Sequence, residues 1–187
     1  MVNKTQENLL KAFAGESQAR NKYTMFAKEA RKQNQEWIAR VFEETSEQER
    51  AHAAEEYEMI REAVSVEGGL SVEPFSNKTT DNLKMAAAGE HYEWTEMYPS
   101  FEAQAKVDGD KEAERLFREV AKVEEKHEER YIIIARHIDT NTLYNQDAEL
   151  EWKCLNCGYI HFGKTPPTTC PVCKKPFGWY QPLGLVR

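Results

Sequence analysis

Two Glu-x-x-His pairs carry the most chemical content in the sequence, Glu49 with His52 and Glu124 with His127. In a helix, residues i and i+3 lie on one face about 4.5 Å apart along the axis, so both side chains of a pair can bind one metal ion. One such pair in a chain with 32 acidic residues is weak evidence, because a solvated helix face produces it as readily. The positions of other glutamates decide between the two interpretations.

Each pair stands opposite a single glutamate in a predicted helical hairpin. Ala14-Gly15-Glu16 recurs as Ala88-Gly89-Glu90, which indicates that one hairpin was duplicated. In each hairpin the single glutamate and the glutamate of the pair lie equally far from the predicted turn, so they stand level with each other. Two single glutamates and two Glu-x-x-His pairs on four helices are the pattern of a di-iron or di-manganese carboxylate site in a bundle core. Because buried carboxylates without cations are strongly unfavourable, these residues predict a metal centre.

The two hairpins differ at one informative position. Glu93 follows Glu90 by one turn, whereas Ala19 stands at the matching place after Glu16. With Glu93 the five glutamates carry a charge of −5, which two ferrous ions bring to −1 and two ferric ions with a bridging oxide also bring to −1. A nearly constant charge suits a buried redox site. The alternative is a surface carboxylate one turn further along the helix.

Tyr23 and Tyr98 lie about two turns after the single glutamates, near the same helix faces. Their phenols are candidates to donate hydrogen bonds to the ligating carboxylates, and packing in the core is an equal alternative. Other acidic residues are interpreted as solvated, namely Glu7, Glu43, Glu47, Glu56 and Glu128. Histidines without a ligand-spaced partner are interpreted as structural or surface residues, namely His91, His137 and His161.

All four cysteines lie near the C-terminus as two Cys-x-x-Cys pairs, Cys154 with Cys157 and Cys170 with Cys173. Such pairs can place four thiolates tetrahedrally around one metal, and so short a segment could hardly fold without it. Zinc and iron use the same tetrahedron, and the spacing leaves the choice open. Aromatic side chains could cover this site, namely Trp152, Tyr159, Phe162, Phe177 and Trp179.

Four long helices must position these residues, roughly 5–31, 36–64, 78–106 and 111–137. Strong helix formers dominate up to residue 138, whereas five prolines and four glycines after residue 152 favour turns and short strands. We expect a linker over 139–147, between a four-helix bundle over 1–146 and a metal domain over 147–187. The connection between the second and third helices can cross the bundle in a ferritin-like topology. It can equally let the second hairpin pack against the first hairpin of another subunit, and both arrangements remain open.

Charge and hydropathy exclude several classes of protein. A net charge of −7 argues against a nucleic-acid binder, whose affinity rests on clustered Lys and Arg. No stretch approaches the roughly 20 apolar residues of a membrane-spanning helix, and the N-terminus lacks the apolar run of a signal peptide. We therefore expect a cytoplasmic protein with no nucleic-acid or membrane partner.

Over nearly its whole length the chain resembles the rubrerythrin family. The resemblance rests on Gly-Glu-Ser-Gln-Ala-Arg-Asn-Lys-Tyr at 15–23, Glu-Arg-Ala-His at 49–52, Gly89-Glu90 with Glu93, Glu124-x-x-His127, and the Cys-x-x-Cys-Gly-Tyr and Cys-Pro-Val-Cys knuckles. No ligand position of the family pattern is missing. The resemblance implies an all-α ferritin-like four-helix bundle followed by a small rubredoxin-like β/loop metal domain.

The family pattern also assigns ligands. It implies that Glu49 and Glu124 bridge two irons, that Glu16 and Glu90 are terminal ligands, and that His127 holds one iron. The four cysteines would hold a third iron, with zinc as an alternative at that site.

The remaining family positions imply a redox-dependent ligand. The second iron of the pair is expected to exchange His52 for Glu93 when its redox state changes. Together with Tyr23 and Tyr98 as groups that handle protons, these are the candidate catalytic residues.

The resemblance implies a non-haem di-iron peroxidase that reduces hydrogen peroxide to water. Electrons would pass through the rubredoxin-like iron from a separate NAD(P)H-linked reductase or a rubredoxin. Family members are oligomers in which the tail iron of one subunit faces the di-iron site of another, so at least a homodimer is expected.

Two other functions remain open. The first is a ferroxidase or iron store, which needs a large closed shell of subunits. The second is a metal-stabilised interaction protein without enzymatic activity, with zinc in the tail. An oxygenase is less favoured, because nothing in the sequence marks a pocket for an organic substrate.

Overall fold

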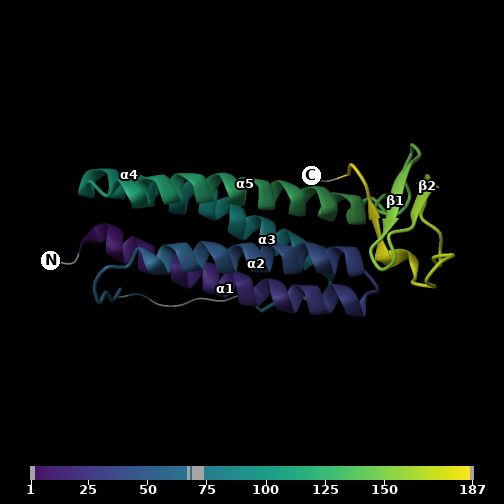
Figure 1. Ribbon diagram of the computed structural model, residues 1–187, viewed down its shortest axis with the longest axis horizontal. Helices are drawn as coiled ribbons and strands as arrows, with labels where there is room; N and C mark the ends of the chain where they lie inside the picture. The colour runs from purple at the N-terminus through teal and green to yellow at the C-terminus, as the bar shows by residue number, and fades with distance from the viewer. Residues whose placement is uncertain (1–2, 67, 69–73, 186–187) are drawn as a thin grey trace.

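The computed structural model describes residues 3–66, 68 and 74–185, and shows a bundle of long helices with a small sheet domain at one end (Figure 1). The helical elements are α1 (Lys4–Lys32), α2 (Glu36–Glu58), α3 (Thr79–Tyr92), the π-helical segment η1 (Glu93–Met97), α4 (Tyr98–Asp108) and α5 (Lys111–Asp139). The small domain contains β1 (Leu150–Cys154), β2 (Ile160–Gly163), the 3-10 turn η2 (Phe177–Trp179) and β3 (Tyr180–Pro182). The predicted ferritin-like bundle with a C-terminal β/loop domain is confirmed. None of the described helices is long and apolar enough to cross a membrane.

Helix α2 ends at Glu58, before the predicted boundary at residue 64. The side-chain amide of Gln6 on α1 provides hydrogen bonds in place of those of a further helical turn. Its Nε2 donates to the Met59 carbonyl at 3.2 Å, and its Oε1 accepts from the Arg61 N–H at 2.7 Å. The Arg61 guanidinium then lies 3.1 Å from Asp110, at the turn before α5. Contacts with distant segments, rather than local propensity, therefore end this helix.

The predicted third helix is interrupted by η1, which the sequence analysis missed. Pro99 at the start of α4 has no N–H to donate to the carbonyl of Thr95, which lies within η1, and the helical ladder widens there. The wider turn absorbs one extra residue. Tyr98, which follows Glu90 by one residue more than Tyr23 follows Glu16, is thereby brought to the matching place in its hairpin.

The described ends of the connection between α2 and α3 are held at opposite ends of α1. At one end of α1, Gln6 holds Met59. Just past the other end, Gln33 donates to the Asn77 carbonyl at 2.9 Å and accepts from the Thr79 N–H at 3.3 Å. Helices α2 and α3 are therefore parallel, and both hairpins of one chain pack together as in a ferritin-like crossover bundle. Gly69, which lies in the predicted connection between the second and third helices, is outside the described residues.

Two apolar clusters fill the bundle, one toward each end. The first is built around four aromatic rings whose neighbouring centroids lie 5.4–6.1 Å apart, namely Tyr23, Phe26, Phe42 and Tyr131. The second includes Tyr98, Phe101 and Phe117. Along α1 and α5, the glutamates and histidines of interest fall between residues of the first cluster and residues of the second; on α2, they fall between first-cluster residues and Met59, just past the end of the helix. The bundle thus encloses a polar layer between two apolar ones.

The small domain is a three-stranded antiparallel sheet with strand order β2-β1-β3. It docks on the turn between α1 and α2, where Gly178 lies against the backbone. A Cβ added to Gly178 would stand 1.6 Å from the carbonyl oxygen of Asn34. Arg40 on α2 donates to the Leu155 carbonyl at 3.2 Å, and its guanidinium lies 5.4 Å from the centre of the Trp179 ring. These contacts hold the cysteine loops against the end of the bundle.

Replacing Gly178 with Ala is expected to undock the small domain. The added methyl overlaps the Asn34 carbonyl, and overpacking of this kind costs about 1–3 kcal/mol. Faster amide hydrogen exchange over residues 34–40 and at Leu155, with the metal content of the cysteine site unchanged, is the expected result. The control is Gly15→Ala in α1, where an added Cβ meets nothing within 4 Å. Equal exchange in the Gly178→Ala variant and the parent protein would contradict this role for Gly178.

Candidate metal centres

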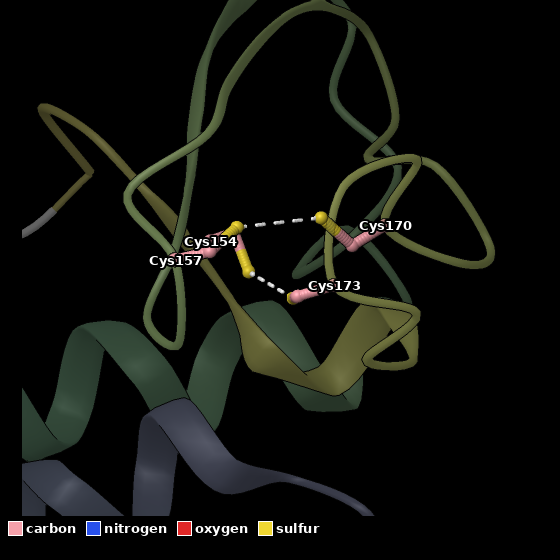
Figure 2. A group of neighbouring side chains, drawn as sticks. All are labelled: Cys154, Cys157, Cys170 and Cys173. Atoms are coloured by element: carbon pink, nitrogen blue, oxygen red, sulfur yellow. Dashed lines mark hydrogen bonds between the residues drawn. The ribbon is translucent and has the colours of Figure 1, made fainter.

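The two cysteine loops have the same backbone geometry. In the first, Cys154 N–H donates to the Tyr159 carbonyl at 2.8 Å, and Gly158 N–H donates to the Cys154 carbonyl at 2.9 Å. In the second, the matching bonds from Cys170 and from Lys174 are 2.8 and 3.0 Å. Gly158 and Lys174 both have positive φ angles, of 77° and 63°, which lets each loop turn back sharply. Two equivalent turns thereby point two pairs of sulfur atoms at each other (Figure 2).

The spacing of the four sulfur atoms fits a bound ion rather than disulfides. The Cys154 and Cys173 sulfurs lie 3.6 Å apart, and those of Cys157 and Cys170 lie 3.7 Å apart. A tetrahedron with metal–sulfur bonds of about 2.3 Å has edges of about 3.8 Å, whereas a disulfide bond measures about 2.05 Å. All four sulfurs lie within 4.8 Å of one another, so they can hold one tetrahedral iron or zinc ion.

The predicted aromatic cover of the cysteine site is partly wrong. Trp152 is fully buried beside the cysteines, as expected. Phe162 and Phe177 are 64% and 43% exposed, so they do not shield the site. Tyr180 takes that place instead, because strand β3 pairs with β1 and brings Tyr180 opposite Cys154.

The polar layer of the bundle contains two overlapping groups of metal-type donors. Within each group one donor atom per residue lies within 4.8 Å of all the others; the groups are Glu16, Glu49, His52 and Glu124, and Glu49, Glu90, Glu124 and His127. Glu49 and Glu124 belong to both groups. Two metals side by side, bridged by two carboxylates, are the arrangement that such overlapping groups can hold.

Several donor atoms of this layer lack a hydrogen-bond partner among the described residues. Both carboxylate oxygens of Glu49 and Glu124, and Nδ1 of His52 and of His127, are buried without a hydrogen bond. Nδ1 of His52 lies 3.0 Å from a carboxylate oxygen of Glu49 and 3.0 Å from one of Glu124. Buried polar atoms that face one another without partners are strongly unfavourable, and bound divalent cations satisfy all of them at once.

Protonation replaces the metal charge when the layer is metal-free. Burial, together with the nearby charges of Glu93 and Glu124, raises the pKa of Glu16 well above its usual value. Burial and the charges of Glu124 and Glu49 raise the pKa of Glu93 to about 8. Burial alone would lower the pKa of His52, but the adjacent carboxylates of Glu124 and Glu49 outweigh it and raise that pKa to about 10. Metal binding must therefore displace protons from this layer.

The two tyrosines reach across the bundle to the opposite hairpin. The Tyr23 hydroxyl on α1 donates to Glu90 on α3, and the Tyr98 hydroxyl on α4 donates to Glu16 on α1. Both phenols are fully buried. The hydrogen bonds expected from the sequence are present, but each joins a tyrosine to a glutamate of the other helix pair.

The two histidines are held differently. Nε2 of His127 lies 3.0 Å from the side-chain oxygen of Gln48, an arrangement that leaves Nδ1 free to face the carboxylates. In the part of the chain that the structure describes, Nε2 of His52 has no such hydrogen-bond partner. Gln48 was missed in the sequence, although it directly precedes Glu49 and could have been considered as a residue that orients a ligand.

The interpretation of Glu56 as a solvated residue is wrong. Its carboxyl is fully buried, and its Oε1 lies 2.9 Å from the Tyr98 hydroxyl. The spacing from Glu49 and His52 to Glu56 follows one helix face, which was the available signal. Glu93, on η1, is partly buried and belongs to neither donor group.

The other acidic and histidine residues lie outside the metal layer. His91 is exposed and lies 3.0 Å from Glu128, which also accepts a hydrogen bond from Trp94. His137 lies 2.7 Å from the Thr142 hydroxyl. These histidines are structural or surface residues, as expected from the sequence.

The fold and its donor sets define a class of protein: a two-metal carboxylate four-helix bundle fused to a tetracysteine domain. The family model described as rubrerythrin matches residues 7–133, and the model described as rubrerythrin, rubredoxin-like domain matches residues 152–177. The chain belongs to the rubrerythrin family. It is accordingly an iron-binding protein with a di-iron carboxylate site and a rubredoxin-like four-cysteine site.

Individual relatives match over nearly their whole length. A rubrerythrin of Porphyromonas gingivalis is 42% identical over 186 residues, which cover 96% of this chain and 90% of the relative. A rubrerythrin of Nitratidesulfovibrio vulgaris is 40% identical, with 97% and 95% covered. The solved structure of fully reduced, all-ferrous nigerythrin has a TM-score of 0.65 at 37% identity, covering 95% of this chain and 86% of that one.

Replacing Gln48 with Leu is expected to weaken metal binding at the His127 position. The His127 Nε2–H would lose its acceptor, and loss of such a partner lowers metal affinity about 10–100-fold. Competitive titration with a chelator measures this as early loss of one of the two bundle metals. Gln18→Leu on α1 is the control, and an unchanged titration of the Gln48→Leu variant would contradict the role.

The metal-free bundle is expected to become less stable as pH rises. The pKa values of Glu16 and Glu93 are raised on folding, so the folded chain binds more protons and its stability falls as pH rises; for Glu93 this fall runs from about 4.5 to about 8. The raised pKa of His52 acts in the same direction, from 6.5 to about 10. The pKa of Glu124 is lowered on folding, which has the opposite effect on the pH dependence of stability. The stability that Glu124 contributes is lost only as pH falls below 4.5.

Thermal unfolding followed by circular dichroism checks this expectation. The melting temperature of the metal-free protein should fall by about 5 °C or more as pH rises from about 4.5 to about 8. The iron-loaded protein, in which metal replaces the protons, should show a much flatter profile. A metal-free protein that gains stability over the same range would contradict the protonated layer.

Proposed function

We propose that the protein reduces hydrogen peroxide to water at the di-iron site, with electrons delivered through the tetracysteine iron. The observation that carries the proposal is a pair of donor groups that share Glu49 and Glu124, with one further carboxylate, Glu93, near enough that, besides burial, the charges of Glu124 and Glu49 raise its pKa. Membership of the rubrerythrin family supports an oxidative-stress role for a protein of this kind.

We assign the ligands by the two donor groups. Glu49 and Glu124, which belong to both groups, would hold both metals, Glu16 and His52 would hold one metal, and Glu90 and His127 would hold the other. In the reduced state the bound iron supplies the two electrons that break the O–O bond.

His52 and Glu93 are the pair that exchanges. His127 is anchored through Gln48, whereas His52 is partly exposed and lacks a matching partner among the described residues. The less anchored histidine is the one that can leave its metal at low cost. Glu93, on the wider turn η1, would replace it with a negative charge when the metal charge rises.

Tyr23 and Tyr98 hold and move protons at the carboxylates. Their hydroxyls donate to Glu90 and Glu16, and burial raises the pKa of both phenols well above the usual value, so they remain protonated donors. The two apolar clusters exclude water from the layer and keep these bonds strong.

The position of the tail supports electron transfer between subunits. The small domain contacts the turn near residue 35, and along α2 about 20 Å separate that residue from Glu49. A homo-oligomer, at least a dimer, shortens this path by facing the cysteine site of one subunit toward the di-iron layer of another. A separate NAD(P)H-linked reductase or a rubredoxin is the proposed donor to the cysteine site.

Peroxide turnover by two variants tests the proposal. With a reductase and NAD(P)H, the iron-loaded protein should consume peroxide, and Cys170→Ser should lower the turnover rate at least tenfold because the relay is lost. In the same variant, a single oxidation of a chemically reduced di-iron site by peroxide should keep its rate. Glu93→Ala should slow that single oxidation.

The opposite result separates this function from iron storage. Full turnover by a protein with both substitutions would refute the peroxidase relay. Uptake of many irons per chain into a large closed assembly would indicate a ferritin-like store instead.

A further inference from the structure

Glu56 is a buried carboxyl outside both metal donor groups. It lies on α2 one turn after His52, and its side chain is fully buried. Its Oε1 is 2.9 Å from the Tyr98 hydroxyl, and its Oε2 has no hydrogen-bond partner among the described residues. A buried carboxylate with so few partners would be strongly destabilised if it were charged.

The hydrogen bonds of Tyr98 require an additional proton. The single phenolic hydrogen faces two acceptors, because the Tyr98 hydroxyl lies within hydrogen-bonding distance of both Glu16 and Glu56. One phenol O–H can donate to only one of them. Since Glu16 belongs to a metal donor group and keeps its charge for the cation, the phenol donates to Glu16 and must accept from Glu56.

We propose that Glu56 is a carboxylic acid that positions Tyr98 and supplies a proton through it to Glu16. This inference rests on the proposed peroxidase function. The resulting chain of hydrogen bonds runs from Glu56 through Tyr98 to Glu16 and ends at the metal layer. Burial raises the pKa of Glu56 to about 8, in agreement with a proton held on this group.

The other hairpin lacks this device. Tyr131 follows His127 by the same number of residues as Glu56 follows His52. Its ring packs edge-on against Tyr23 at a centroid distance of 5.7 Å, in the first apolar cluster. The proton source therefore serves only the half of the site that contains Glu16 and His52, which is also the half with the exchanging ligand.

The proton balance of peroxide reduction uses this chain once per turnover. Reduction of one peroxide to two waters breaks the O–O bond and takes two electrons, which bound ferrous iron would supply, and two protons, one through this chain and one from solvent. One of these protons moves from Tyr98 through Glu16 to the departing oxygen as the Glu56 proton moves onto the Tyr98 oxygen. Glu56 is left as a carboxylate and regains its proton from solvent before the next turnover.

Infrared spectroscopy of the iron-loaded protein tests the protonation directly. The parent protein should show a carboxylic-acid C=O band that shifts in D₂O and is absent in Glu56→Gln. Glu36→Gln is the control, because Glu36 is a buried glutamate of the same helix that pairs with Arg31 and Arg40 instead. A spectrum unchanged by Glu56→Gln would overturn the inference, whatever the activity of the protein.

Stopped-flow oxidation of the reduced protein by peroxide tests the relay. Glu56→Gln and Tyr98→Phe should each slow oxidation at least tenfold with unchanged iron content, and the double variant should be no slower, because both break one chain. Glu56→Asp, which keeps the acid, should restore part of the rate.

The outcomes separate the two proposals. An oxidation rate in Glu56→Gln equal to that of the parent would overturn the relay while leaving the peroxidase function intact. A reduced parent protein that peroxide does not oxidise would overturn the peroxidase function, and the infrared band would still decide whether Glu56 is protonated.

Discussion

The repulsion among buried carboxylates in the middle of the bundle is the constraint on which the rest of the structure depends. Glu16, Glu49, Glu90 and Glu124 are all fully buried and converge from four helices. Without cations this layer can persist only by taking up protons, as the raised pKa values of Glu16 and Glu90 show. Two apolar clusters above and below it keep water out and make metal binding the favourable solution.

The bundle is built from two similar hairpins, and the differences between the hairpins make the two halves of the site unequal. The wider turn η1 brings in Glu93 and keeps Tyr98 level with Tyr23. Gln48 anchors one histidine, whereas Glu56 adds a carboxyl behind the other half. A nearly symmetric scaffold therefore provides two metal positions with different surroundings.

The small domain needs a bound ion for a different reason, because its own apolar core is small. A segment of this size cannot bury enough apolar surface to fold alone, and the four cysteines complete it around an ion. Its position, in contrast, depends on close backbone contact at Gly178 and on Arg40. The ion and the docking contacts are separate requirements, because one stabilises the domain and the other sets its distance from the bundle.

Much of this protein is determined by the sequence alone, because the relevant signals are local. The Glu-x-x-His and Cys-x-x-Cys spacings place donors on one helix face or one turn, and equal distances from a turn predict which glutamates stand level. Tertiary structure decided the end of α2, the reach of Tyr23 and Tyr98 across the bundle, and the burial of Glu56. Each of these depends on hydrogen bonds or packing between residues far apart in the chain, such as Gln6 with Met59, and no local pattern encodes such partners.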